Sequence, residues 1–217
     1  LGDSTFKELS YKDVLVGVEV LGRQWERFFT NSEKAIGVLL PNVNATPVTL
    51  LSLWVTGKIP ALLNYSAGMT TLLSCCQLAR IKKVITSRRF LERARLDLSD
   101  LEKAGIELIY LEDVRTGITT KSKLSTLIRQ KFTRPFQSTP TDPESVAVIL
   151  FTSGSEGVPK GVELTHANLM ANIRQMLSVI DLTDQDRVFN ALPMFHSFGL
   201  TIGTLLPLVR GILVFLY

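Results

Sequence analysis

The sequence predicts an α/β fold with a largely parallel sheet, or sheets, flanked by helices. Short apolar runs of strand length alternate with segments of helical periodicity along the whole chain. The strand-like runs are continuously apolar, which is typical of parallel strands that are covered on both faces. The mean hydropathy of +0.23 lies on the apolar side, as expected for such a buried sheet.

The first half of the chain contains four predicted helices and four predicted strands. Apolar residues recur at helical spacing over residues 11–29, and Ser10 can cap the first turn. Further helices are predicted over residues 45–56, 71–80 and 88–96. The strands predicted between them cover residues 35–40, 59–63, 83–86 and 107–111.

The second half begins with a helix predicted over residues 121–131 and a proline-rich exposed connector over 133–143. An apolar strand at 146–151 leads into a glycine-rich turn, and a strand at 162–164 is predicted to complete a hairpin. The elements that follow are a helix at 166–179 capped by Thr165, a strand at 187–192, an apolar helix at 198–209 and a strand at 212–217.

Composition excludes several classes of protein. A net charge of +4 over 217 residues is too weak to indicate a nucleic-acid partner. The two cysteines, Cys75 and Cys76, are adjacent and have no metal-binding spacing, which favours a reduced, cytoplasmic location. Two charge-free stretches, 35–57 and 191–209, are interrupted by prolines and polar residues, which favours a buried strand, turn and helix over a membrane span.

Both ends of the sequence resemble interior positions of a protein. The chain starts without Met, and it stops in an apolar, strand-like run. We therefore expect it to be a segment of a longer protein.

The run from Ile149 to Gly161 carries the strongest chemical signal. Its glycines permit positive φ and close backbone approach, so that neighbouring N–H groups can converge on phosphate oxygens. Hydroxyl groups and one lysine add donors and positive charge. The residues predicted to grip a nucleotide triphosphate are Thr152, Ser153, Gly154, Ser155, Gly157 and Lys160. Because Lys160 lies between Pro159 and Gly161, the loop does not match the P-loop of phosphotransferases.

The loop at 152–161 resembles the signature loop of the adenylate-forming superfamily, which includes acyl-CoA synthetases, luciferases and peptide-synthetase adenylation domains. Residues 9–13, 37–42 and 192–196 also resemble motifs of that superfamily. Within it, residues 59–68, 109–113 and 191–217 are most similar to the synthetase half of bifunctional 2-acylglycerophosphoethanolamine acyltransferase/acyl-carrier-protein synthetases.

This resemblance implies the N-terminal part of the large AMP-binding domain of an acid–thiol ligase. Such an enzyme uses ATP with Mg²⁺ to activate a long-chain fatty acid as acyl-adenylate, then transfers it to the thiol of acyl carrier protein. Lys160 and His196 would act in catalysis, and no residue of the chain is expected to bind a metal directly. The mobile C-terminal domain and the acyltransferase domain would lie outside the chain, which we expect to be inactive alone. The parent protein would contact the cytoplasmic face of the membrane peripherally.

Several alternatives stay open at this point. The acceptor thiol would be CoA in a long-chain fatty acyl-CoA synthetase, and a non-catalytic nucleotide-binding module is a third reading. Glu156 departs from the Ser or Thr of many relatives, which puts its role as a phosphate ligand in doubt. His166 begins a helix and is expected to be structural.

A basic cluster is predicted to be either a solvated helix face or a dock for acidic carrier protein or anionic lipid. Its members are Arg80, Lys82, Lys83, Arg88, Arg89, Arg93 and Arg95.

Overall fold

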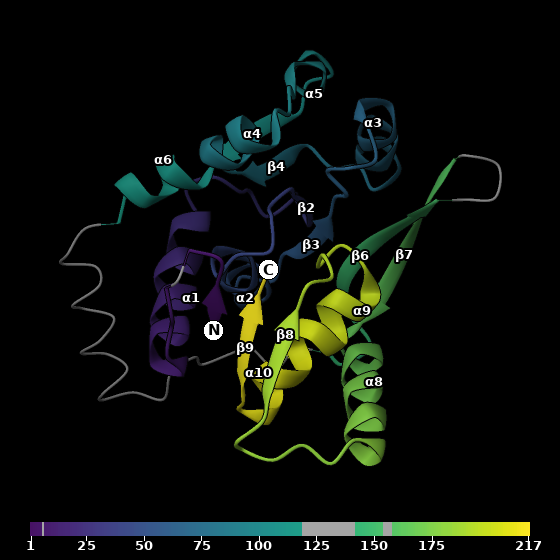
Figure 1. Ribbon diagram of the computed structural model, residues 1–217. Helices are drawn as coiled ribbons and strands as arrows, with labels where there is room; N and C mark the ends of the chain where they lie inside the picture. The colour runs from purple at the N-terminus through teal and green to yellow at the C-terminus, as the bar shows by residue number, and fades with distance from the viewer. Residues whose placement is uncertain (6, 119–141, 154–157) are drawn as a thin grey trace.

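The computed structural model describes residues 1–5, 7–118, 142–153 and 158–217, which form two β-sheets with helices packed around them (Figure 1). The strands of the larger sheet lie in the order β5 (Glu107–Tyr110), β4 (Lys83–Thr86), β2 (Ala35–Val38), β3 (Ile59–Leu62), β6 (Val146–Ser153) and β7 (Pro159–Thr165). The smaller sheet has the order β1 (Gly2–Asp3), β9 (Leu213–Leu216) and β8 (Arg187–Asn190).

The sheets are largely parallel, as the sequence predicts. Among the described strands, only β6 and β7 pair in antiparallel fashion. The expected fold class, α/β with a largely parallel sheet flanked by helices, is therefore confirmed.

Helices cover both faces of the six-stranded sheet. Helices α1 (Tyr11–Trp25) and α2 (Ala45–Val55) belong to one apolar core, and α3 (Met69–Leu78) and α5 (Ser99–Lys103) to another. Successive strand residues alternate between these cores, because side chains along a strand point to opposite faces. In β4, for example, Val84 packs into the α3 side and Ile85 into the α1 side. The continuous apolar runs of the sequence follow from this double burial.

Helix α1 begins where the sequence predicts and ends earlier. Ser10 and Asp13 form a reciprocal capping box at its start. The helix was expected to reach residue 29 but ends at Trp25, after which the chain continues in a tighter turn with Phe28 N–H bonded to the Trp25 carbonyl at 3.0 Å. This turn keeps Phe29 stacked near Trp25, at 5.3 Å between ring centroids. The apolar periodicity therefore continues past the end of the helix.

The sequence does not predict three short elements of the fold. Strand β1, helix α5 and helix α6 (Leu111–Thr116) have two, five and six residues, too few to show a period. Helix α4 (Arg88–Ala94) is confirmed within one turn of its predicted end. The predicted helix at 121–131 and most of the predicted connector at 133–143 lie outside the described residues.

The C-terminal helical region lies where the sequence predicts, but its last predicted helix is divided into three shorter segments. Helix α8 (His166–Val179) has the predicted Thr165 cap, reinforced by Asn168. The helix predicted over 198–209 is instead α9 (Ser197–Leu200), the π-helical turn η1 (Thr201–Leu205) and α10 (Leu206–Arg210). The break has a physical cause, since Pro207 lacks the N–H that would bond to Gly203.

The charge-free stretch 35–57 folds as strand, loop and helix, as predicted, whereas 191–209 folds as a loop and helical segments without the predicted strand. Within the described ranges, no helix is both long enough and apolar enough to cross a membrane.

Candidate nucleotide-binding site

The turn predicted to clamp phosphate joins β6 and β7 at one side of the six-stranded sheet. The two strands form an antiparallel hairpin in which Thr152 pairs with Lys160 and Ser153 with Pro159. Directly paired residues project from the same face, so the Thr152 hydroxyl and the Lys160 ammonium lie on one side of the hairpin. The predicted hairpin is thus confirmed. The other predicted residues of the turn lie outside the described part of the chain: Gly154, Ser155 and Gly157, together with Glu156.

The described end of this hairpin is open to solvent. Thr152, Ser153 and Lys160 are all exposed. Lys160 forms no ion pair with any residue that the structure describes. Its ammonium group is therefore exposed and unpaired with any carboxylate of the described residues.

The hairpin tip lies at the edge of the sheet where parallel strands end. β6 runs parallel to β3, β3 to β2, and β2 to β4. Their carboxyl ends therefore meet at one edge, and Thr152 and Ser153 share it with the loops after β2, β3 and β4. Ligands of open parallel sheets bind in crevices at this edge.

His196 lies on a loop that aromatic contacts tie to the same edge. It precedes α9, its side chain is exposed, and its imidazole lies 4.7 Å from the Phe195 ring centroid. Phe195 in turn meets Tyr65, in the loop after β3, edge-on at 5.1 Å. Neither a hydrogen bond nor a ring contact joins His196 to the described residues of the hairpin. Lys160, near the start of β7, and His196, on the loop before α9, thus lie on separate segments at the same sheet edge.

Asn42 holds the loop that carries His196, a role that no pattern in the sequence indicates. Its Nδ2 donates to the carbonyls of Leu192 and Tyr217 at 2.8 and 3.3 Å, and its Oδ1 accepts from Met194 N–H at 3.1 Å. Asn42 follows β2, so it joins the larger sheet to the loop after β8 in the smaller one. In the sequence Asn42 follows Pro41 directly after the strand predicted over residues 35–40, a pattern that indicates only where a strand ends.

Asn190 fixes the same loop from the other side. This buried amide donates to the Gly199 carbonyl and the Thr204 hydroxyl at 3.0 and 3.1 Å, and accepts from Leu192 N–H at 3.1 Å. Gly199 permits the tight packing, because a Cβ there would lie 2.4 Å from the Pro193 carbonyl oxygen. Two asparagines and a glycine therefore set where the His196 loop lies.

A cavity of about 1010 Å³ opens beside this loop and is called the edge cavity here. Its wall includes Asn42, Tyr65, Phe90 and Pro193, along with polar residues from the N-terminal segment and from α4 and α6. The cavity lies over the ends of β2, β4 and β5, on the far side of the sheet order from β7.

The basic cluster is only partly available to a partner. Lys83 pairs with Glu33 and Glu107 at 3.5 and 3.2 Å. Arg88 forms a bidentate pair with Asp113 at 2.6 and 2.7 Å and lies 4.0 Å above the Tyr110 ring. These two cations of the predicted cluster are therefore engaged within the fold.

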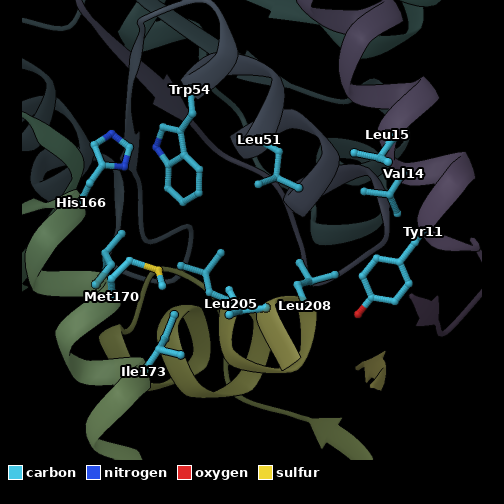
Figure 2. A pocket seen from close by; sticks show the side chains of 12 residues that line it. Tyr11, Val14, Leu15, Leu51, Trp54, His166, Met170, Ile173, Leu205 and Leu208 are labelled. Atoms are coloured by element: carbon cyan, nitrogen blue, oxygen red, sulfur yellow. The ribbon is translucent and has the colours of Figure 1, made fainter. Parts of the chain in front are cut away.

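A second, apolar groove of about 280 Å³ lies among α1, α2, α8 and α10 (Figure 2). His166 and Trp54 contact each other edge-on at 5.7 Å at one end of it, and Trp54 Nε1 donates to the Ala147 carbonyl. Ala147 is five residues before Thr152 on β6, which corresponds to about 17 Å along a strand. The groove is therefore separate from the hairpin tip. Burial lowers the pKa of His166, in keeping with its expected structural role.

Neither thiol nor metal chemistry is indicated by the described residues. Both cysteines are buried, and burial raises the pKa of Cys75 to about 11 and that of Cys76 to about 12. Such thiols stay protonated and unreactive. No group of three or more His, Cys, Asp or Glu side chains in the described ranges is placed to hold a metal ion.

Fold and hairpin together define a domain of the adenylate-forming class of α/β proteins. Residues 3–217 match the AMP-binding enzyme family, and the chain belongs to it. It is 29% identical over 193 residues to the 2-succinylbenzoate–CoA ligase of Enterococcus faecalis and 26% identical over 222 residues to the long-chain-fatty-acid–CoA ligase 5 of Rattus norvegicus. These matches each cover 89% of this chain, which spans 36% and 31% of the two relatives.

A solved structure confirms the fold. The o-succinylbenzoate CoA synthetase of Bacillus subtilis, in complex with its acyl-adenylate intermediate, superposes with a TM-score of 0.80 at 17% identity. The match covers 97% of this chain and 50% of that one.

Proposed function

We propose that the chain is the N-terminal segment of the AMP-binding domain of an acid–thiol ligase. One observation carries the proposal. Lys160 lies exposed opposite Thr152 at the open end of the hairpin, with no carboxylate partner among the described residues. A hydroxyl donor and an exposed cation on one face suit the β- and γ-phosphates of ATP.

The proposed reaction has two steps. A carboxylate oxygen of the acid attacks the α-phosphorus of ATP, the bond to the bridging oxygen breaks, and pyrophosphate leaves from the acyl-adenylate. A thiolate then attacks the acyl carbon, and AMP leaves as the thioester forms. Mg²⁺ enters as the complex of ATP, in keeping with its preference for phosphate oxygens.

The residues of this chain contribute positioning and charge. Thr152 and Ser153 donate hydrogen bonds to the phosphate chain, and Lys160 offsets the charge that pyrophosphate gains as it leaves. His196 faces the reacting carboxylate and the α-phosphate, where an imidazole N–H stabilises developing negative charge. Asn42 and Asn190 act as positioning residues for the His196 loop.

For substrates, we propose a long-chain fatty acid and the thiol of acyl carrier protein. The likeness of residues 59–68, 109–113 and 191–217 to acyl-carrier-protein synthetases supports this choice. CoA is the alternative acceptor, supported by relatives that are named CoA ligases, among them the rat long-chain fatty acid enzyme.

The experiment replaces Lys160 by Ala in the full-length enzyme and measures ATP–pyrophosphate exchange driven by fatty acid. We expect exchange to fall about 100-fold, because a charge-assisted contact to the leaving group is lost. Thermal unfolding should not change, since the side chain is exposed. Lys12→Ala, an exposed lysine on α1, is the matched control. Exchange within about twofold of the wild type would refute the role given to Lys160.

A further inference from the structure

Helices α4 and α6 carry four arginines and three carboxylates. Two of these carboxylates are occupied within the fold: Asp113 by Arg88, and Glu112 by the Ser87 hydroxyl at 2.8 Å and the N–H groups of Arg88 and Arg89 at 3.2 and 3.3 Å. The third, Glu92, is exposed on α4. Burial alone would raise the pKa of Glu112, but these hydrogen bonds outweigh it and lower the pKa. Glu112 therefore stays ionised and caps the start of α4.

Three neighbouring arginines have no such partner. Arg89 and Arg93 lie four residues apart on α4, and Arg115 lies near the end of α6. All three are exposed and border the edge cavity, and none forms an ion pair with a described residue. They are called the arginine face here. Arg89 sits in the first turn of α4, where a cation is unfavourable for the helix dipole, so its charge does not serve helix stability.

The arginine face is connected to the proposed catalytic loop. Phe90, between Arg89 and Arg93 on α4, meets Tyr65 edge-on at 5.2 Å. Tyr65 meets Phe195 at 5.1 Å, and Phe195 lies beside His196. Three ring contacts thus span the distance from the arginines to the place where the acyl-adenylate would form.

We infer that the arginine face docks an acidic protein surface that presents the acceptor thiol on a flexible arm. The inference rests on the proposed function and names its partner more closely. Opposite charge orients such a partner and speeds its encounter. Docking on α4 and α6 would place the arm beside the edge cavity, whose wall includes Pro193 of the loop that carries His196, and this offers the arm a route toward the acyl group.

The observations favour an acidic protein over a membrane. Membrane-surface helices present large apolar side chains beside their cations. The exposed large apolar residues of the described chain lie on other elements, and none is on α4, α5 or α6. The concave border of the edge cavity also fits a protruding partner better than a flat bilayer.

The test is the double variant Arg89→Glu with Arg93→Glu in the full-length enzyme. Three quantities are measured: ATP–pyrophosphate exchange without thiol, and the KM for acyl transfer to acyl carrier protein and to CoA. We expect exchange and the KM for CoA to stay within about twofold of the wild type, and the KM for carrier protein to rise at least about tenfold. Raising the salt should shrink that difference, because exposed charges are screened.

Two control variants sharpen the result. Arg89→Lys with Arg93→Lys keeps the charge and should keep the KM for carrier protein near the wild-type value. Arg174→Glu makes the same charge change on α8, which lies at the opposite side of the molecule from α4 (Figure 1), and should leave all three quantities unchanged. Should the double variant lose exchange through misfolding, Arg115→Glu provides the same comparison from α6.

Several outcomes overturn the inference. An unchanged KM for carrier protein removes the docking face. An equal rise in the KM for CoA assigns the arginines to a phosphate group of the small thiol. Binding to phosphatidylglycerol vesicles is measured alongside these three quantities, and its loss without a change in the KM for carrier protein assigns the arginines to a membrane. Absence of exchange in the wild-type enzyme refutes the proposed function itself, which is a different result from any of these.

Discussion

Replacing Asn42 by Ala should loosen the joint between the two sheets. The side chain is 8% exposed and bonds to three backbone groups. The free-energy cost of the substitution depends mainly on two of these partners, the Met194 N–H and the Leu192 carbonyl. Met194 is 3% exposed, so its N–H would be left without a partner, at about 1–3 kcal/mol. Leu192 is 46% exposed, so water can reach its carbonyl, and only the net bond of about 1 kcal/mol is lost.

We therefore expect the free energy of unfolding to fall by about 2–4 kcal/mol. Urea titration followed by the fluorescence of Trp25 and Trp54 measures it. ATP–pyrophosphate exchange should fall as well, because the loop before His196 loses its anchor. Gln77→Ala, which truncates an exposed amide, is the control and should have little effect. A loss below about 0.5 kcal/mol for Asn42→Ala would show that the joint does not depend on this side chain.

Two further predictions concern packing and pH. Gly199→Ala should destabilise the protein by about 1–3 kcal/mol, because its Cβ would lie 2.4 and 2.6 Å from the Pro193 and Leu192 carbonyl oxygens; a wild-type melting temperature would contradict this. For His166, burial lowers the pKa from 6.5, so the unfolded chain binds the proton more readily. Stability should thus decrease as the pH falls through and below 6.5, and His166→Gln should flatten that slope in unfolding experiments between about pH 8 and pH 5; an unaltered slope would show that another group is responsible.

The candidate site was partly predictable because its signals are local. The hairpin follows from an apolar strand, a glycine-rich turn and a second short strand, and its register places Lys160 opposite Thr152. His196 was predicted to be catalytic because residues 192–196 resemble a motif of the adenylate-forming superfamily. Asn42 was missed because its partners lie 150 and more residues away in the sequence. No local pattern reports such bonds.

The basic cluster, likewise, could be predicted only in part from the sequence. The sequence identifies seven cations close together, but spacing along the chain does not reveal which are neutralised. Asp113 pairs with Arg88, and Glu107 pairs with Lys83, because β5 lies beside β4. Glu33 pairs with Lys83 because β2, which follows Glu33, lies on the other side of β4. Arg115 joins the arginine face only because α6 follows β5 at the same sheet edge.

The sequence alone determined the alternation of buried strands and helices, the caps at Ser10 and Thr165, and the chemical character of the turn before Lys160, because periodicity, capping and turn chemistry act over a few residues. The tertiary structure decided which loops meet at the sheet edge, how Asn42 joins the two sheets, and which arginines lack an ion pair among the described residues. These features depend on contacts between distant segments, and such contacts exist only once parallel strands have brought their carboxyl ends together.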